Sequence, residues 1–378
     1  GDVSYVGTAY TFQARTYNYQ LWSWGYNSQG QSGVNNVIHY SSPIQIPGTT
    51  WDKDSSLVPL AVKTDGTLWT WGYNDDGRLG LNQSTPTKYS SPVQIPGTTW
   101  RSANSNSVSM AMATKTDGTL WVWGNNQYGS WGTNVGGNPG GKLSSPVQVP
   151  GTTWGTNLGN PTEGASALKS DGTLWMWGDN SKGQLGQNNT TERSSPVQVG
   201  SGTDWAVHGR AQDSTVAVKT DGTMWAWGTG DQGELAQNNT TEYSSPVQIP
   251  GTSWSTVSSA YSAGGDEIFG AIRTDGTLWT WGDQADGSLG HNQESVRYSS
   301  PTQIPGTTWS KISVGNRRMA AIKTDGTLWA WGQNDSGGLG INVGGPGKRS
   351  SPTQVPGTNW YSVNFGRRHA VSSGIKQV

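Results

Sequence analysis

The chain has no cysteine, little charge and no long apolar segment, and each absence excludes a class of structure or chemistry. Without cysteine, disulfides, thiol nucleophiles and cysteine-ligated metal sites are excluded together. Charged residues make up 13% of the 378 residues, about half the usual share of ~25%, and the net charge is −1. This balance gives no reason to expect nucleic acid or an anionic membrane as a partner. No apolar run approaches the ~18 residues of a membrane span, so we expect no membrane insertion.

Motifs of catalysis and metal binding are also missing from the sequence. The four histidines are spread along the chain without the spacing of metal ligands, and no Gly-x-Ser-x-Gly, phosphate-binding loop or His-Glu-x-x-His is present. Acidic clusters such as Asn74–Gly77 and Asp283–Gly287 lack the alternating carboxylates of a calcium loop, and their composition is typical of tight turns. We therefore predict no catalytic residue, no metal ligand and no cofactor.

Tryptophan is abundant, and its spacing predicts the architecture. Seven Trp-x-Trp-Gly segments recur at intervals of 47, 52, 54, 50, 54 and 50 residues. A period near fifty is typical of repeat architectures, in which each unit buries its faces only against its neighbours. We expect the paired tryptophans to be structural packing residues, namely Trp22, Trp24, Trp69, Trp71, Trp121, Trp123, Trp175, Trp177, Trp225, Trp227, Trp279, Trp281, Trp329 and Trp331.

Each repeat contains a hairpin signal. In the seventh repeat, Asp325-Gly326 separates two β-prone runs, and this dipeptide is typical of two-residue type I′ turns. Such a turn predicts Ile322 opposite Trp329 and Ala320 opposite Trp331. The same dipeptide recurs in every repeat except the first, which has Asn18-Tyr19.

Two further segments complete each repeat. An inner strand precedes the hairpin, and a proline-bearing segment such as Ser350–Gly357 follows a glycine-rich loop and suits an outer edge strand. No segment shows the period of a helix. Four-stranded units repeated seven times predict an all-β fold, a seven-bladed β-propeller of antiparallel blades.

The repeat also resembles that of a known family. The pattern Thr-Asp-Gly-Thr-Leu-Trp-x-Trp-Gly-x-Asn-x-x-Gly-x-Leu-Gly, followed by Ser-Ser-Pro-Val-Gln-Ile-Pro-Gly, is similar to the regulator of chromosome condensation repeat over essentially the whole chain. The resemblance implies a seven-bladed propeller. Departures from this pattern are small. Ala236 replaces the last glycine of the loop in the fifth repeat, and Ser32 and Trp131 replace the loop leucine in the first and third repeats. The sequences of the individual repeats are most similar to repeats of bacterial and bacteriophage proteins.

The functions that this resemblance implies fit the chain only in part. The family's nucleotide exchange factor acts through a protruding β-wedge and a basic amino-terminal tail, but no repeat here carries such an insertion, and residues 1–17 contain Arg15 as their one basic residue. The family's plant ultraviolet-B photoreceptor has tryptophans in loops that here read Gly315–Arg318 and Gly366–His369, without tryptophan.

The loop between the first two strands varies in every repeat, and scaffold-held variable loops are where binding usually lies. We expect these loops on one face, around the channel: Asp52–Ser56, Asn104–Ser107, Asn160–Glu163, Gly209–Asp213, Ala263–Glu267, Gly315–Arg318 and Gly366–His369. Two adjacent loops carry Arg317, Arg318, Arg367, Arg368 and His369, which predicts a basic site for a carboxylate, phosphate or sulfate. The alternative is a solvated rim balanced by nearby carboxylates.

The two ends of the chain compete for one place in the predicted ring. Residues 3–16 and 361–373 both look like inner strand pairs, so inner pairs outnumber the seven tryptophan-bearing strands by one. Residues 361–373 directly follow Trp360, as the inner strands follow the corresponding tryptophan in the other repeats. We therefore expect them to complete the first blade, with strands from both ends of the chain closing the ring. We predict an extension or partner link at residues 1–17 and a single propeller at 18–378.

The sequence favours a non-catalytic structural and recognition module. Its polar, weakly charged composition and its bacteriophage-like repeats favour display on a virion or the extracellular surface, with a protein or glycan surface, or other virion components, as partner. Two alternatives stay open. One is an intracellular adaptor or an exchange factor for a small GTPase. The other is an enzyme with its site at the mouth of the channel.

Overall fold

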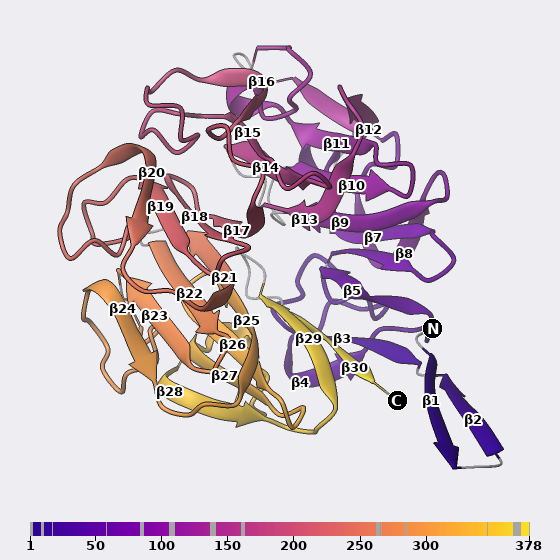
Figure 1. Cartoon of the computed structure of the whole chain (residues 1–378). Coiled ribbons are helices and arrows are strands. Elements are labelled where there is room, and N and C mark those ends of the chain that lie inside the picture. Colours follow the sequence, from indigo (N-terminus) through magenta and orange to yellow (C-terminus); the bar gives the residue numbers. More distant parts are fainter. Residues whose placement is uncertain are drawn as a thin grey trace.

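The computed structural model describes residues 3–377 apart from 9, 10, 17, 58, 84–86, 106–109, 137–140, 160–162, 262–264, 266, 284, 285, 346 and 366–371, with the backbone alone for residues 3–16 and 55–57. These residues form seven four-stranded antiparallel sheets around a ring and one separate two-stranded sheet (Figure 1). The predicted all-β, seven-bladed propeller is therefore confirmed. No described helix is long and apolar enough to cross a bilayer.

The blades are numbered by their Trp-x-Trp-Gly segments, and each begins at the inner strand. The strands outside the ring are β1 (Val3–Thr8) and β2 (Thr11–Thr16). Blade 1 contains β29 (Trp360–Phe365), β30 (Ser372–Gln377), β3 (Tyr19–Gly25) and β4 (Tyr40–Gln45); blade 2 contains β5 (Trp51–Leu57), β6 (Leu60–Lys63), β7 (Leu68–Tyr73) and β8 (Lys88–Ile95); blade 3 contains β9 (Trp100–Ser105), β10 (Met110–Lys115), β11 (Leu120–Asn125) and β12 (Lys142–Val149).

The remaining four blades follow the same order. Blade 4 contains β13 (Trp154–Leu158), β14 (Gly164–Lys169), β15 (Leu174–Gly178) and β16 (Arg193–Gln198); blade 5 contains β17 (Trp205–Arg210), β18 (Ser214–Lys219), β19 (Met224–Gly228) and β20 (Tyr243–Ile249); blade 6 contains β21 (Trp254–Tyr261), β22 (Glu267–Arg273), β23 (Leu278–Gly282) and β24 (Tyr298–Ile304); blade 7 contains β25 (Trp309–Gly315), β26 (Arg318–Lys323), β27 (Leu328–Gln333) and β28 (Lys348–Val355). Short 3-10 turns are η1 (Asp75–Gly77), η2 (Gln127–Gly129) and η3 (Asp335–Gly337).

Strands from both ends of the chain close the ring, as predicted. β30 pairs with β3 in blade 1, with Trp22 opposite Gly374 and Ser23 opposite Ser373. Trp360 at the start of β29 packs edge-on against Trp22 and Trp24, with ring centroids 6.5 and 5.8 Å apart. The β1–β2 hairpin forms a sheet of its own outside the ring (Figure 1).

The hairpin turn differs from the prediction by one residue. Lys323 donates its N–H to the carbonyl of Thr327, so the loop has three residues, and Gly326 takes the left-handed conformation with φ +76°. This is a type I turn followed by a bulge residue rather than a type I′ turn. The predicted pairs across the hairpin were therefore wrong: Ile322 lies opposite Leu328 and Ala321 opposite Trp329.

In blades 2 to 7, the Asp-Gly-Thr turn holds the first tryptophan of the pair in place. In blade 7, the Asp325 carboxylate accepts hydrogen bonds from the Thr327 N–H and hydroxyl at 2.9 and 2.7 Å, and the Trp329 Nε1–H donates to that hydroxyl at 2.9 Å. The same network recurs in blades 2 to 6. These hydrogen bonds to Thr327 and its equivalents lower the pKa of each turn aspartate.

A cation in every blade lies between two tryptophans. Its charged group lies 4.0 to 5.2 Å from the centroids of the first tryptophan of the pair and of the tryptophan that opens the inner strand. Such cation–π contacts stabilise by about 0.5–2 kcal/mol each. The cations are Lys63, Lys115, Lys169, Lys219, Arg273, Lys323 and Lys376.

The glycine-rich loop after each Trp-x-Trp-Gly fastens one blade to the next. Where blade 7 meets blade 1, Gly337 (φ +76°) lies against the backbone of Ser41, and a Cβ there would clash with the Ser41 Cα. The Asn342 N–H donates to the carbonyl of Ser41 at 2.8 Å, and the buried Trp24 donates from Nε1 to the carbonyl of Gly338 at 3.1 Å. All seven junctions repeat these contacts, so the closing junction is built like the others.

Candidate functional site: an acidic cluster between blades 4 and 5

The residue at the start of the second strand, directly before it in blades 4, 5 and 7 and as its first residue in blade 6, is charged in four successive blades. These residues occupy equivalent positions, because each carbonyl accepts a hydrogen bond from the residue that follows Trp-x-Trp-Gly in its own blade, at 2.8 to 3.1 Å. They are Glu163 in blade 4, Asp213 in blade 5, Glu267 in blade 6 and Arg317 in blade 7. Three adjacent blades therefore present a carboxylate at the same level of the ring, and the fourth presents a guanidinium.

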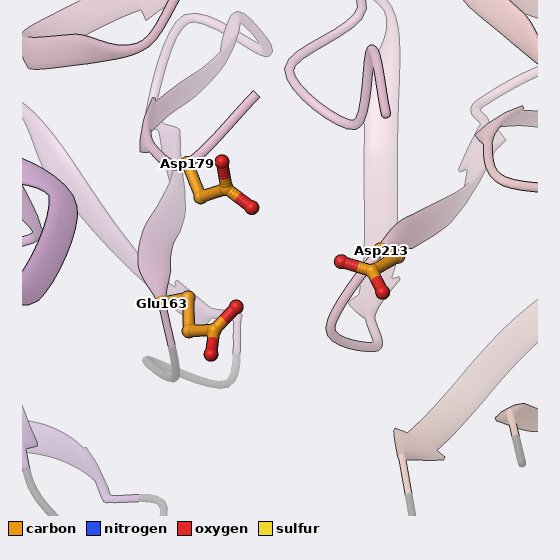
Figure 2. A group of neighbouring side chains, drawn as sticks. All are labelled: Glu163, Asp179 and Asp213. Atoms are coloured by element: carbon orange, nitrogen blue, oxygen red, sulfur yellow. The ribbon is translucent and has the colours of Figure 1, made fainter. Parts of the chain in front are cut away.

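At the junction of blades 4 and 5, three carboxylates come together. Oxygens of Glu163, Asp179 and Asp213 lie within 4.8 Å of one another, and Figure 2 shows Glu163 and Asp179 on one blade pointing toward Asp213 on the next. Asp179 is 4% exposed, whereas Glu163 and Asp213 are half-buried. Asp179 is held by hydrogen bonds that its carboxylate accepts from the Ser181 N–H and from Gln184 Nε2, at 3.0 and 2.8 Å.

A buried arginine lies beside these carboxylates. Arg210, at the end of β17, is 1% exposed, and its guanidinium donates across the junction to the carbonyls of Trp177 and Asp179 at 3.4 and 3.5 Å. Burial lowers the pKa of Arg210 to about 10, while the charges of Asp179 and Asp213, among others, oppose that shift. Arg210 therefore stays a cation at neutral pH beside the three carboxylates.

A second inter-blade contact orders the turn that carries Asp213. Glu267 of blade 6 is 1% exposed and accepts hydrogen bonds from the N–H groups of Gln212 and Asp213 at 2.8 and 2.7 Å, and from the Ser214 hydroxyl. Burial raises the pKa of Glu267 to about 7, against the effect of those hydrogen bonds. Glu267 of blade 6 thus fixes the position of Asp213 in blade 5.

Other charged groups also lie at this junction. Lys182 of blade 4 pairs through its Nζ with Glu242 of blade 5 at 3.1 Å, and Arg193 lies opposite Gly178, the residue before Asp179. A cation such as Ca²⁺ takes six to eight oxygen ligands, whereas the oxygens of Asp179 already accept hydrogen bonds. The arrangement suits the ammonium or guanidinium group of a partner better than a metal ion, since such a group needs only a few acceptors.

The Ser166–His208 pair is the arrangement in this region that comes nearest to a nucleophile and its base. His208 Nε2 and the Ser166 hydroxyl lie 2.8 Å apart across the junction, and both side chains are buried. Burial lowers the pKa of His208 to about 3, and its Nδ1 has no hydrogen-bond partner within the described part of the chain. A catalytic histidine needs an orienting group there and a pKa nearer neutrality. The pair therefore packs two blades together.

A sequence profile described as the RCC1-like domain matches residues 55–372, which is most of the chain. The chain belongs to the RCC1-like domain family. A comparison with curated proteins gave no match.

Solved structures share the architecture of this RCC1-like ring. Prp20p from Saccharomyces cerevisiae, described with its binding properties to Gsp1p and histones, is 16% identical, with a TM-score of 0.77 over 96% of this chain and 92% of that one. Yeast RCC1 (Prp20) bound to Kap60 is 17% identical, with a TM-score of 0.76 over 96% and 90%. Human WBSCR16 is 19% identical, with a TM-score of 0.74 over 96% and 99%. At these identities the likeness shows the fold.

The RCC1-like ring places the predicted basic residues in different environments. Arg317 is partly exposed, and its Nη1 lies 3.5 Å from an Asp286 oxygen. Arg318 is 2% exposed, donates from Nε to the carbonyl of Asn316 at 3.1 Å, and has its pKa lowered to about 10 by burial. Residues 367–369 lie outside the described residues. The basic site stays a prediction.

Sequence reasoning found the acidic residues only as members of variable loops. Glu163, Asp213 and Glu267 close three of the loops that we expected on one face, and the structure brings Glu163 and Asp213 together. Asp179, Arg210 and the role of Glu267 were missed. Aligning the repeats on the start of the second strand gives a signal, because it shows acidic residues in three consecutive copies at that position.

Proposed function

We propose that this RCC1-like ring is a recognition module that binds a protein partner, and that the acidic cluster between blades 4 and 5 receives a basic segment of it. The observation that carries the proposal is the convergence of Glu163, Asp179 and Asp213 where blades 4 and 5 meet, with Asp179 held by hydrogen bonds. A charged site whose side chains are already held in place suits binding, because few side chains lose conformational entropy when the partner binds.

The comparisons support a protein partner in general terms. Prp20p is described with Gsp1p and histones, and yeast RCC1 (Prp20) with Kap60, so solved relatives in fold bind other proteins. This supports the adaptor or exchange-factor-like alternative more than display on a virion or cell surface, and no named relative is a virion component or a glycan-binding protein. The display hypothesis, the bacteriophage resemblance and an extracellular location stay predictions.

Two further expectations remain proposals. The division into an extension at 1–17 and a propeller at 18–378 is one of them. The basic site of Arg317, Arg318, Arg367, Arg368 and His369 is the other, and sulfate binding that is lost in an Arg317→Ala/Arg367→Ala variant would support it. A non-catalytic role is favoured by the low pKa of His208, which makes the Ser166–His208 pair a poor acid–base couple.

Removing one charge from the cluster tests the proposal. We expect Glu163→Gln to weaken binding of a short fluorescent peptide of alternating arginine and glycine by about fivefold, since an ion pair of ~1 kcal/mol corresponds to that factor. Glu294→Gln is the control, because Glu294 is an exposed carboxylate in the loop after β23 of blade 6 and pairs with Lys348 of blade 7 at 2.8 Å. Fluorescence anisotropy measures both. Equal affinities of the two variants would argue against the acidic cluster as the binding site.

A further inference from the structure

Strands from the C-terminal end of the chain lie beside β3 in blade 1, although another strand pair directly precedes β3 in the sequence. β29 and β30 fill the position beside β3, as the first and second strands of the sheet β29-β30-β3-β4. β1 and β2 form an antiparallel pair of their own, in register from Val3 opposite Thr16 to Thr8 opposite Thr11. That pair precedes β3 directly in the chain, where blades 2 to 7 have their own inner pairs.

The sequence of β2 carries the features of a second strand. In blades 2 to 7 the second strand ends on a Lys or Arg that is followed by Thr or Ser, as in Lys323-Thr324, and this cation lies between two tryptophans. In blade 1, Lys376 takes that place, 4.8 Å from the Trp22 ring and 4.3 Å from the Trp360 ring. Arg15-Thr16 at the end of β2 matches the same dipeptide pattern and lies just before β3.

The C-terminal pair has a packing advantage that explains why it holds this position. It brings Trp360 and Phe365 into the buried core between blades 7 and 1, at 2% and 4% exposure, and Ile375 into the core between blades 1 and 2, at 0% exposure. β1 has no tryptophan at its start to match Trp360. Burying a large aromatic side chain is worth a few kcal/mol, so Trp360 biases the choice between two otherwise similar strand pairs.

We infer that residues 3–16 are a second closing pair for blade 1, which replaces β29 and β30 when these strands leave the ring. Replacement keeps β3 paired, whereas departure of β29 and β30 alone would leave an exposed strand edge. If Arg15 takes the place of Lys376, which lies opposite Gln20, then Phe12 comes opposite Ser23, where Ser373 lies now. Closing the ring from the amino-terminal side would also release the C-terminal strands.

The absence of cysteine allows each arrangement to be detected by its own disulfide. In the full chain, Ser23→Cys/Ser373→Cys reports the arrangement seen in the structure, and Phe12→Cys/Ser23→Cys reports the replaced one. A disulfide forms only where Cα atoms come within about 7 Å. Thr8→Cys/Ser23→Cys is the control for chance encounter, because β1 would lie two strands from β3 in the replaced arrangement.

The test adds Ile375→Asp to each cysteine pair, since a carboxylate at this buried position disfavours β30 in the ring. We expect the Phe12–Ser23 pair to cross-link at least about tenfold more than without Ile375→Asp, and the Ser23–Ser373 pair to lose its cross-link, with cooperative melting kept. An unchanged Phe12–Ser23 yield alongside a lost Ser23–Ser373 cross-link overturns the inference. If Ile375→Asp abolishes cooperative melting, the same comparison of the Phe12–Ser23 and Ser23–Ser373 cross-link yields is made with Ile375→Ala. Cross-linking of the Thr8–Ser23 control to the same extent as the Phe12–Ser23 pair also overturns the inference.

Discussion

Glu234 occupies a position at which the neighbouring blade has an amide. Its carboxylate accepts a hydrogen bond from the Gln232 N–H at 2.8 Å, as the Gln184 side-chain oxygen accepts one from the Lys182 N–H in blade 4. Glu234 is 1% exposed, and burial raises its pKa from 4.5 to about 7, with Asp231 and Asp283 adding to the shift. A carboxyl group is therefore placed where the fold also accepts a neutral side chain.

The stability of the ring should decline as pH rises from about 4.5 to about 7, because over this window the folded chain retains the Glu234 proton that the unfolded chain has lost. We expect Glu234→Gln to remove this part of the pH dependence and to raise the free energy of unfolding at about pH 8 by up to ~3 kcal/mol. Below about pH 4.5 the variant and the parent should be nearly equal.

Urea denaturation followed by tryptophan fluorescence checks this prediction over the whole window. Gln184→Glu is a useful counterpart, since it places a carboxyl group at the equivalent point of blade 4, beside Asp179, and should add a pH dependence of the same sign. Parallel pH profiles of the parent and Glu234→Gln would contradict the explanation by burial.

The site residues could not be found from the sequence one at a time. Asp179 follows a Trp-x-Trp-Gly segment and Asp213 ends a turn, and at both places an aspartate is common for local reasons. Their meeting depends on the angle between two adjacent blades, which no local pattern encodes. The burial of Arg210 and Glu267 likewise depends on the packing of one blade against the next.

At the scale of strands and turns, the sequence predicted the number and order of elements and missed one register. Asp325-Gly326 is compatible with a two-residue turn and with a three-residue turn that ends in a left-handed glycine. The hydrogen bonds from Thr327 to the Asp325 carboxylate favour the second, because they hold Thr327 as the first residue after the loop. The error moved each predicted partner by one residue without changing the fold.

The loop glycines at the blade junctions make a prediction about stability. Gly337→Ala should lower the free energy of unfolding by at least about 2 kcal/mol, since the new Cβ would meet the backbone of Ser41 and an alanine in the left-handed region adds ~1 kcal/mol. Gly136→Ala is the control, because Gly136 has open space around its Cα. Thermal and urea unfolding measure both variants. A Gly337→Ala variant as stable as Gly136→Ala would show that the junction can shift to admit a side chain.

For the whole molecule, the regular tryptophan spacing was enough to predict seven blades and closure by both ends of the chain. This worked because one contact set recurs at every junction: the second tryptophan of each pair donates to a loop carbonyl of the preceding blade. The function could be predicted from the sequence less well than the fold. The repeated positions specify the ring, and binding depends on the few positions where the copies differ.

The most direct test of the proposed function is amide hydrogen exchange of the intact chain with and without the arginine-glycine peptide. The account predicts slower exchange on binding at the segments around Glu163, Asp179 and Asp213, where blades 4 and 5 meet, and little change at the corresponding segments of blades 2 and 3. Protection confined to other blades, or none under conditions in which the peptide binds, would contradict the assignment of this acidic cluster as the binding site.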